Sequence, residues 1–317
     1  MRALIAREGR VRLEERPTPE PGGSEVVVAT AGSGINRADL LQLRGAHLAP
    51  PGWPADIPGL EVAGTVAAVG PRTSTRSVGD RVFGIVGGGA HATHVLTPES
   101  LLAPVPHGLD LEEAGGVAEV FVTAHDALVT QAGLRSGERV LIHGVGSGVG
   151  TAATQLVRAL GATSVGTART PAKLERAKEL GLDEGVVAGE NMAKEIGEVD
   201  VVLDLVGGDY AAVDAEVCRP TGRIVLIGLL AGSSAHLDLG LLLYKRLTLR
   251  GTVLRGRPDY LKAAAMSAFG REVAPLFSSG ALRPVVDRLL PLEEAQAGYD
   301  ALAGNQTFGK IVLTAEG

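Results

Sequence analysis

The sequence predicts an α/β protein in which a domain built on a doubly wound parallel sheet interrupts a β-rich domain. Short apolar runs broken by glycine and proline fill residues 1 to about 111, whereas apolar strands alternate with helical segments from there to about 251. A last predicted strand, 309–314, is too small a piece to form a domain, so it is expected to pack on the first part. We therefore predict one domain over 1–112 and 252–317 and a second over 113–251.

Composition and charge argue against several classes of function. The 317 residues are 45% hydrophobic and 21% charged, with a net charge of −6 and no basic tail, which argues against nucleic acid or an anionic membrane as the main partner. No apolar run approaches the roughly 20 residues that span a bilayer, and the first ten residues carry charges where a signal peptide needs its apolar core. We expect a cytoplasmic protein. Cys218 is the only cysteine, so neither an intrachain disulfide nor a cysteine-built metal site can form.

Taken in order, the β-rich part comes first. Its predicted strands are short apolar runs bounded by glycine and proline, at 25–30, 61–69, 81–86 and 94–97.

The centre of the second domain is the stretch RVLIHGVGSGVG, residues 139–150. Its apolar run 140–142 is typical of a strand covered on both faces, and apolar residues at helical spacing follow the glycines up to Gly161. A strand, a glycine turn and a helix in this order let a backbone approach a pyrophosphate at the helix N-terminus. The strict G-x-G-x-x-G spacing is not met, because Val145 and Ser147 replace two glycines, so a purely structural tight turn is the alternative.

The next unit predicts which dinucleotide binds. After a strand over 163–168, Arg169 stands where an NAD-binding fold offers an acid to the adenosine ribose, as expected when a 2′-phosphate must be neutralised. Thr170 is the expected N-cap and Pro171 the first helical residue, which places Lys173 in the first turn, where a cation opposes the helix dipole unless an anion binds beside it. We therefore expect NADPH as the cofactor. A solvated basic pair is the alternative.

Two further strands, 199–206 and 223–228, complete the alternating pattern, and a helix is expected over 258–270. Cys218 falls in a segment that reads as a helix with the thiol in the core. The run 247–254 reads as a long apolar strand at the edge of the sheet, and an unprotected edge of that kind pairs with a copy of itself, so we expect a homodimer.

Six short segments recur in an order and spacing that resemble one family: GINRAD at 34–39, GLEVAG at 59–64, VGDRV at 78–82, the glycine turn, LDLVGG at 203–208 and GKIVL at 309–313. Together they resemble the zinc-independent quinone oxidoreductase branch of the medium-chain dehydrogenase/reductase superfamily. The resemblance implies a GroES-like catalytic domain, a Rossmann domain, a homodimer and NADPH-dependent reduction of quinones or α,β-unsaturated carbonyls. The alternatives are an enoyl-thioester reductase on the same scaffold and a protein that binds NADPH without turnover.

The resemblance also implies which residues face the dinucleotide: Asn36, Arg37, Thr123, Gly148, Val149, Arg169, Thr170, Lys173, Gly228, Leu229 and the tail from Asn305 to Lys310. It implies no metal site, because Asn36 and Leu60 stand where zinc-dependent relatives place two zinc ligands. Some relatives have a tyrosine near the adenosine phosphate where this chain has Ala188.

Asn36 and His47 are the candidate catalytic residues, as hydrogen-bond donors to a substrate carbonyl. His47 stands where many relatives carry a tyrosine, and it is either a substrate ligand or a surface-loop histidine. Asn36 is either an amide donor to the substrate or a residue that satisfies the local backbone.

Overall fold

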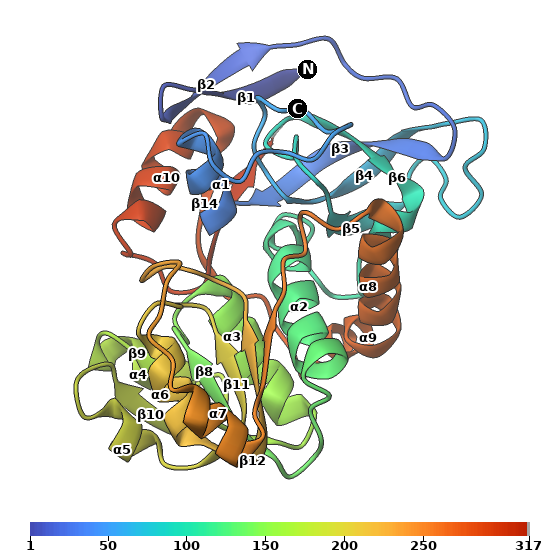
Figure 1. Cartoon of the computed structure of the whole chain (residues 1–317). Coiled ribbons are helices and arrows are strands. Elements are labelled where there is room, and N and C mark those ends of the chain that lie inside the picture. The colour runs from blue at the N-terminus through green and yellow to red at the C-terminus, as the bar shows by residue number, and fades with distance from the viewer. Residues whose placement is uncertain (316–317) are drawn as a thin grey trace. The chain divides into compact units, whose positions relative to one another are not determined.

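The computed structural model describes residues 1–315 and forms two compact units (Figure 1). The first unit contains Met1–Val122 and the chain from Leu254 onward, and the second contains Thr123–Val253. The sequence had placed the start of the second domain earlier, at 113. The chain remains with the first unit longer than expected because the turn at Glu113–Gly116 is pressed against strand β3: a Cβ on Gly115 would lie 2.2 Å from the carbonyl carbon of Gly32.

The first unit is built on a seven-stranded sheet with the strand order β14-β15-β3-β4-β5-β7, while β6 pairs with β3 off this path. A separate antiparallel hairpin joins β1 and β2. The strands of this unit are β1 Arg2–Arg7, β2 Arg10–Glu15, β3 Glu25–Gly34, β4 Glu61–Val69, β5 Arg81–Ile85, β6 His94–Pro98, β7 Leu102–Pro104, β14 Val286–Pro291 and β15 Lys310–Thr314.

This sheet contains all five strands that the sequence predicted for the β-rich part and the chain end. β3 and β4 contribute valines to a hydrophobic core cluster, in which Val26, Val28 and Val62 are fully buried. The last strand, β15, pairs antiparallel with β3 so that Val312 lies opposite Gly34. The end of the chain therefore completes the sheet that its beginning started, which brings Lys310 beside the residues that follow β3.

Helices of the first unit pack at the ends and edges of this sheet. They are α1 Arg37–Leu43, the start of α2 Ala118–His125, α8 Asp259–Glu272, α9 Ala274–Ser278 and α10 Ala295–Ala303, with short 3-10 turns at Glu99–Leu101, Glu113–Gly116 and Leu292–Glu294. α1 begins with a reciprocal cap, in which the Asn36 side chain and the Asp39 side chain each bond the other residue's backbone. The predicted helix over 258–270 is α8.

The second unit is a six-stranded parallel sheet with the order β10-β9-β8-β11-β12-β13. Numbered within the unit, this is the order 3-2-1-4-5-6 of a doubly wound dinucleotide-binding fold, with the reversal between β8 and β11. Its strands are β8 Arg139–His143, β9 Thr163–Ala168, β10 Glu184–Val187, β11 Val199–Asp204, β12 Cys218–Leu226 and β13 Thr248–Gly251. Its helices are α3 Gly148–Ala159, α4 Pro171–Lys178, α5 Met192–Ile196, α6 Tyr210–Val217 and α7 Leu239–Lys245, and a π-helical turn covers Asp126–Gln131.

Two expectations for this unit were wrong in detail. Cys218 does not lie in a helix but begins β12, although its thiol is buried as expected, and burial raises its pKa to about 12. The strand expected over 247–254 is short: β13 covers Thr248–Gly251, because its pairing with β12 ends at Gly251, opposite Leu226, and the chain belongs to the first unit from Leu254 onward. β13 is nevertheless the edge strand that the sequence predicted.

Within residues 1–315, no helix is long and apolar enough to cross a membrane.

Candidate functional site

The glycine turn of the second unit leaves two backbone N–H groups open at the start of α3. Ser147 is the N-cap, and its hydroxyl accepts from the N–H of Gly150 at 3.0 Å while donating to the carbonyl of Gly144 at 2.8 Å. The N–H groups of Gly148 and Val149, the first two helical positions, have no acceptor in the described part of the chain. Such a pair at the positive end of a helix dipole is suited to a phosphate oxygen.

The close packing of this turn explains its composition. A Cβ on Gly150 would lie 2.4 Å from the carbonyl oxygen of Gly144, so a side chain there would push the helix away from the strand. Val145 and Ser147, which break the strict glycine spacing, are accommodated because Val145 is buried and Ser147 is used as the cap. The turn therefore keeps the close strand-to-helix packing of the glycine motif with different residues.

Basic residues lie at the end of β9 as the sequence predicted. Thr170 is the N-cap of α4 and Pro171 its first residue, although the Thr170 hydroxyl makes no capping bond. Arg169 is exposed, and its guanidinium pairs with no acid among residues 1–315. Lys173, in the first turn of α4, is half-buried and does have an interaction partner.

A tyrosine lies near Arg169 in spite of the alanine at 188. Ala188 is packed against the core cluster of this unit. The phenol of Tyr210, at the start of α6, is close enough to Arg169 for that cation to act on it: burial raises the pKa of Tyr210, and the Arg169 charge partly opposes this shift. Sequence comparison by position alone could not find this tyrosine, because it comes from a different helix.

The loops after β11 and β12 pack so closely that their backbones are in contact. A Cβ on Gly228 would lie 2.4 Å from the carbonyl oxygen of Leu205, and Gly207 pairs with Gly232 in an isolated bridge. The predicted residue Leu229 is 53% exposed at the end of this arrangement. Thr123, the remaining predicted residue of this unit, is partly buried in α2.

A buried polar network lies behind the carboxyl ends of β8 and β9. The His143 imidazole bonds the Thr167 hydroxyl and a carboxylate oxygen of Asp214, each at 2.8 Å, and all three side chains are buried. The second oxygen of Asp214 has no hydrogen-bond partner, and burial raises the pKa of Asp214 to about 6, a shift that the His143 contact partly opposes. The sequence analysis did not identify this pair.

In the first unit, the predicted residues form two contacting pairs. Arg37 hydrogen-bonds the side-chain oxygen of Asn305, and Lys310 donates to the side-chain oxygen of Asn36 at 2.7 Å. The partners are far apart in sequence and are joined because β15 returns to β3. His47 belongs to neither pair.

The amide of Asn36 is fully engaged. Its two N–H groups donate to the carbonyl of Gly34 and to Glu61 Oε1, both at 3.1 Å, and its oxygen accepts from Lys310. The local backbone role is therefore present, and donation to a substrate would require one of these bonds to break.

His47 lies exposed in the loop after α1, with a left-handed backbone (φ 51°). Partial burial of the ring and the positive charge of Arg255 lower its pKa, so the ring is neutral near pH 7 and carries one N–H donor. Its carbonyl accepts from Arg255, whose guanidinium also bonds the carbonyl of Gly87 and the side chain of Gln42. Arg255 is buried and thus fixes the loop that carries His47.

Sequence reasoning missed three ionisable residues of the first unit, of which Glu61 and Arg255 are buried and Glu119 is partly buried. Glu61 accepts hydrogen bonds from Asn36, Lys310 and the backbone N–H of Glu119. Glu119 itself is the one acid in an otherwise apolar stretch, 115–122. The signal that could have found Glu61 and Glu119 is a single charge inside an apolar segment, because such charges are rarely buried without a role. Arg255 carries no such signal, because Arg257 and Asp259 follow it closely.

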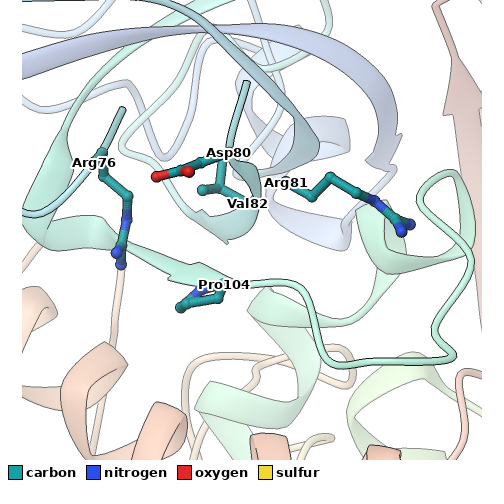
Figure 2. A pocket seen from close by; sticks show the side chains of 5 residues that line it. All are labelled: Arg76, Asp80, Arg81, Val82 and Pro104. Atoms are coloured by element: carbon teal, nitrogen blue, oxygen red, sulfur yellow. The ribbon is translucent and has the colours of Figure 1, made fainter. Parts of the chain in front are cut away.

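A surface cavity of about 250 Å³ opens elsewhere in this unit (Figure 2). Its lining residues are Arg76, Asp80, Arg81, Val82 and Pro104, none of which the sequence proposed for function. Arg76 is already used in the fold, since it donates to the carbonyls of Thr75 and Leu102. Two arginines and one aspartate share its lining.

The zinc positions of related dehydrogenases do not fit a metal here. Leu60 is buried and has no donor atom, and the only oxygen of the Asn36 side chain already accepts from the Lys310 ammonium. An ammonium group at that point repels a cation. Residues 1–315 contain no cluster of three or more histidine, cysteine or carboxylate side chains suited to a metal ion.

Two family models match the chain. The model of the alcohol dehydrogenase GroES-like domain matches residues 22–131, and the model named zinc-binding dehydrogenase matches residues 148–268.

Known proteins match along nearly the whole chain. A quinone oxidoreductase of Pseudomonas aeruginosa is 33% identical over 308 residues, which cover 93% of this chain and 92% of that protein. The polyketide synthase system protein NorB of Streptomyces orinoci is 36% identical over 313 residues, 94% of this chain, but the chain spans only 14% of the length of NorB.

Solved structures share the fold. A mycobacterial protein determined as a complex with NADPH superposes with a TM-score of 0.88 at 27% identity, covering 99% of both chains. The CurK enoyl reductase superposes with a TM-score of 0.85 at 25% identity, also covering 99% of both chains.

Proposed function

Because the chain belongs to the medium-chain dehydrogenase/reductase superfamily, in its quinone oxidoreductase branch, we propose that it reduces quinones or α,β-unsaturated carbonyls with NADPH and without zinc. The observation that carries the proposal is the pair of unpaired N–H groups at Gly148 and Val149, placed at the switch point of a doubly wound sheet. A pyrophosphate fits this pair. The close approach at Gly150 and Gly228 supports the same assignment, since both positions exclude a side chain.

NADPH is proposed over NADH on the basis of charge. Arg169 offers an unpaired guanidinium at the end of β9, where a fold that prefers NAD would place an acid. When bound, the reduced nicotinamide supplies a hydride, and the protein has to hold the dinucleotide, align the substrate and provide the proton. Arg169, Thr170 and Lys173 are proposed for the adenosine end. Asn36, Arg37, Thr123, Leu229, Asn305 and Lys310 are proposed for the remainder of the dinucleotide.

A zinc-independent reaction agrees with the residues at the metal positions. Alcohol oxidation needs a Lewis acid to stabilise an alkoxide, whereas hydride addition to a conjugated carbonyl needs a hydrogen-bond or proton donor at oxygen. His47, neutral near pH 7, is proposed as one such donor.

The test is a measurement of NADPH and NADH oxidation across a panel of quinones, enones and enoyl thioesters, with and without a chelator. We expect turnover of a simple ortho-quinone with NADPH that the chelator leaves unchanged. Tight NADPH binding without turnover of any substrate would make the chain a binding protein. Loss of turnover on removal of one tightly bound zinc per chain would reject the zinc-independent reaction.

An enoyl-thioester reductase is the second candidate. It is favoured by the CurK enoyl reductase among the structural neighbours. Preference for an enoyl thioester over the quinones in the same panel would select it.

We also propose that the chain is a cytoplasmic homodimer that pairs along β13. The proposal is supported by the edge position of this strand and by exposed apolar side chains on and near it: Leu239, Leu243, Tyr244, Leu249 and Val253.

A further inference from the structure

Glu119 is an acid held in a polar cluster of the first unit. It lies in the first turn of α2, between the buried residues Ala118 and Val120. Its backbone N–H donates to Glu61 Oε2 at 2.9 Å, which places the two glutamates side by side. This bond at the N-terminus of α2 therefore fixes the position of the Glu119 backbone relative to Glu61.

The neighbours of Glu119 cannot neutralise it. Glu61 is fully buried and is bound at Oε1 by Lys310 at 2.7 Å and by Asn36 at 3.1 Å. The Lys310 ammonium has three hydrogens, and it has three acceptors within 2.8 Å: Glu61, the carbonyl of Ile35 and the side-chain oxygen of Asn36. No Lys310 hydrogen is left for Glu119.

The remaining charges act at longer range. Asp39 adds a second negative charge, while Arg255 and Lys310 oppose it. Burial and then Glu61 dominate, and they raise the pKa of Glu119 to about 8. The carboxyl group is therefore protonated at neutral pH and is an O–H donor.

Glu119 carries a donor of this cluster that no other group occupies. The Asn36 amide hydrogens are engaged, three of the five Arg255 N–H groups have acceptors, and the Tyr299 hydroxyl is bonded to His91 at 2.9 Å. Within the described residues the Glu119 carboxyl makes no hydrogen bond, and Glu119 is partly buried rather than fully enclosed.

We propose that Glu119 is the proton donor of the reduction, acting on the substrate oxygen that becomes negative as hydride arrives. This inference rests on the proposed function. The O–H bond of Glu119 breaks and an O–H bond of the product forms, and the carboxylate regains its proton from water. The overall reaction consumes the substrate, one NADPH and one proton, and yields the two-electron-reduced product and NADP⁺.

The arrangement suits this role because a carboxyl group with a pKa of about 8 holds its proton at neutral pH and can still release it to a substrate oxygen. The anionic Glu61 disfavours a second negative charge, so a Glu119 carboxylate is reprotonated readily near neutral pH. Asn36 and Lys310 hold Glu61 in place and are positioning residues in this account.

The test compares wild type with Glu119→Gln, which keeps the size of the side chain but carries no transferable proton. With 1,2-naphthoquinone and NADPH, we expect wild-type kcat to fall as the pH rises through about 8, and Glu119→Gln to lose about 100-fold or more in kcat together with this alkaline decline. Glu119→Asp should restore part of the rate. Glu113→Gln, a partly buried glutamate in the preceding turn, is the matched control and should behave as wild type.

A second measurement needs neither cofactor nor turnover. Difference infrared spectra of the wild-type protein should show a protonated carboxyl band that disappears with a midpoint near pH 8 and is absent from Glu119→Gln. Turnover by Glu119→Gln at the wild-type rate, or a carboxyl that ionises below pH 6, overturns the donor role alone. No turnover by wild type on any quinone, enone or enoyl thioester rejects the proposed function, and the donor role with it.

Discussion

Lys310 Nζ lies 2.7 Å from Glu61 Oε1, and the two side chains are only 4% and 0% exposed. The pair joins the last strand of the chain to β4 in the first unit, and Asn36 is hydrogen-bonded to both members. A buried ion pair of this kind contributes little net free energy compared with apolar residues, but loss of one member leaves the other charge unpaired in the core.

Lys310→Met should therefore be strongly destabilising. We expect the free energy of unfolding to fall by about 3 to 5 kcal/mol, because the Glu61 carboxylate loses its cation. Urea denaturation measures this. Lys178→Met is the control, since Lys178 pairs with Glu175 at 2.8 Å on the surface, and its loss should be at most about 1 kcal/mol. Equal losses in the two variants would contradict a structural role for the buried pair.

Cofactor selectivity should depend on the basic residues after β9. Replacing both Arg169 and Lys173 with Ala should weaken NADPH binding at least tenfold to a hundredfold relative to NADH, because each charge-assisted hydrogen bond to the 2′-phosphate is worth about 1.5 to 3 kcal/mol. Arg169→Asp should go further, since it restores a ribose acceptor and repels phosphate. Fluorescence titration gives both dissociation constants.

Lys178→Ala is the matched control for that experiment, because it removes a cation from the same helix at its other end. Its NADPH to NADH ratio should equal that of wild type. The assignment of NADPH would be wrong if wild type bound both dinucleotides equally, or if neither Arg169 variant changed the ratio.

The dimer should depend on the apolar edge of the second unit. Leu243 and Tyr244 are 78% and 87% exposed, and Leu249 lies on the edge strand β13. Leu249→Lys should convert the dimer to a monomer at micromolar concentration, because a buried charge opposes pairing of the edges. Sedimentation velocity distinguishes the two states. Val78→Lys, at an exposed valine of the first unit, should leave the dimer intact, and a monomeric wild-type protein would refute the proposal.

Asp214 should make stability fall with rising pH. Its pKa is about 6 in the folded chain against an ordinary 3.8, so the folded state binds the proton more tightly and stability decreases as the pH rises through this interval. Relative to Asp214→Asn, wild type should lose up to about 3 kcal/mol between pH 4 and pH 7. Thermal unfolding at several pH values measures the difference.

Asp209→Asn, at the exposed N-cap of the same helix, is the control for this effect. Its stability relative to wild type should not change with pH over the interval. If Asp214→Asn and Asp209→Asn gave the same profile, the buried network around His143 would not be the source of the pH dependence.

Much of the fold could be predicted from the sequence because it depends on local patterns. The alternation of apolar strands with helices indicated the doubly wound sheet, and the N-cap at Thr170 and the glycine turn were identified from neighbouring residues. The length of β13 could not be predicted, because it is set by where the pairing with β12 ends, at Gly251. Cys218 was assigned to the wrong element because α6 and β12 follow each other without a loop.

The sequence by itself determined which residues are basic, which turns are glycine-rich and which metal ligands are missing, since these are properties of single positions and short spacings. The tertiary structure alone decided that Arg37 contacts Asn305, that Lys310 joins Glu61 and Asn36, and that Glu119 keeps its proton. These contacts arise where β15 returns to β3, and the energies of the charges depend on how far they are removed from water. Neither the pairing of distant strands nor the local dielectric is encoded in a short stretch of sequence, which is why the partners of Arg37 and Lys310 were found only in the folded chain.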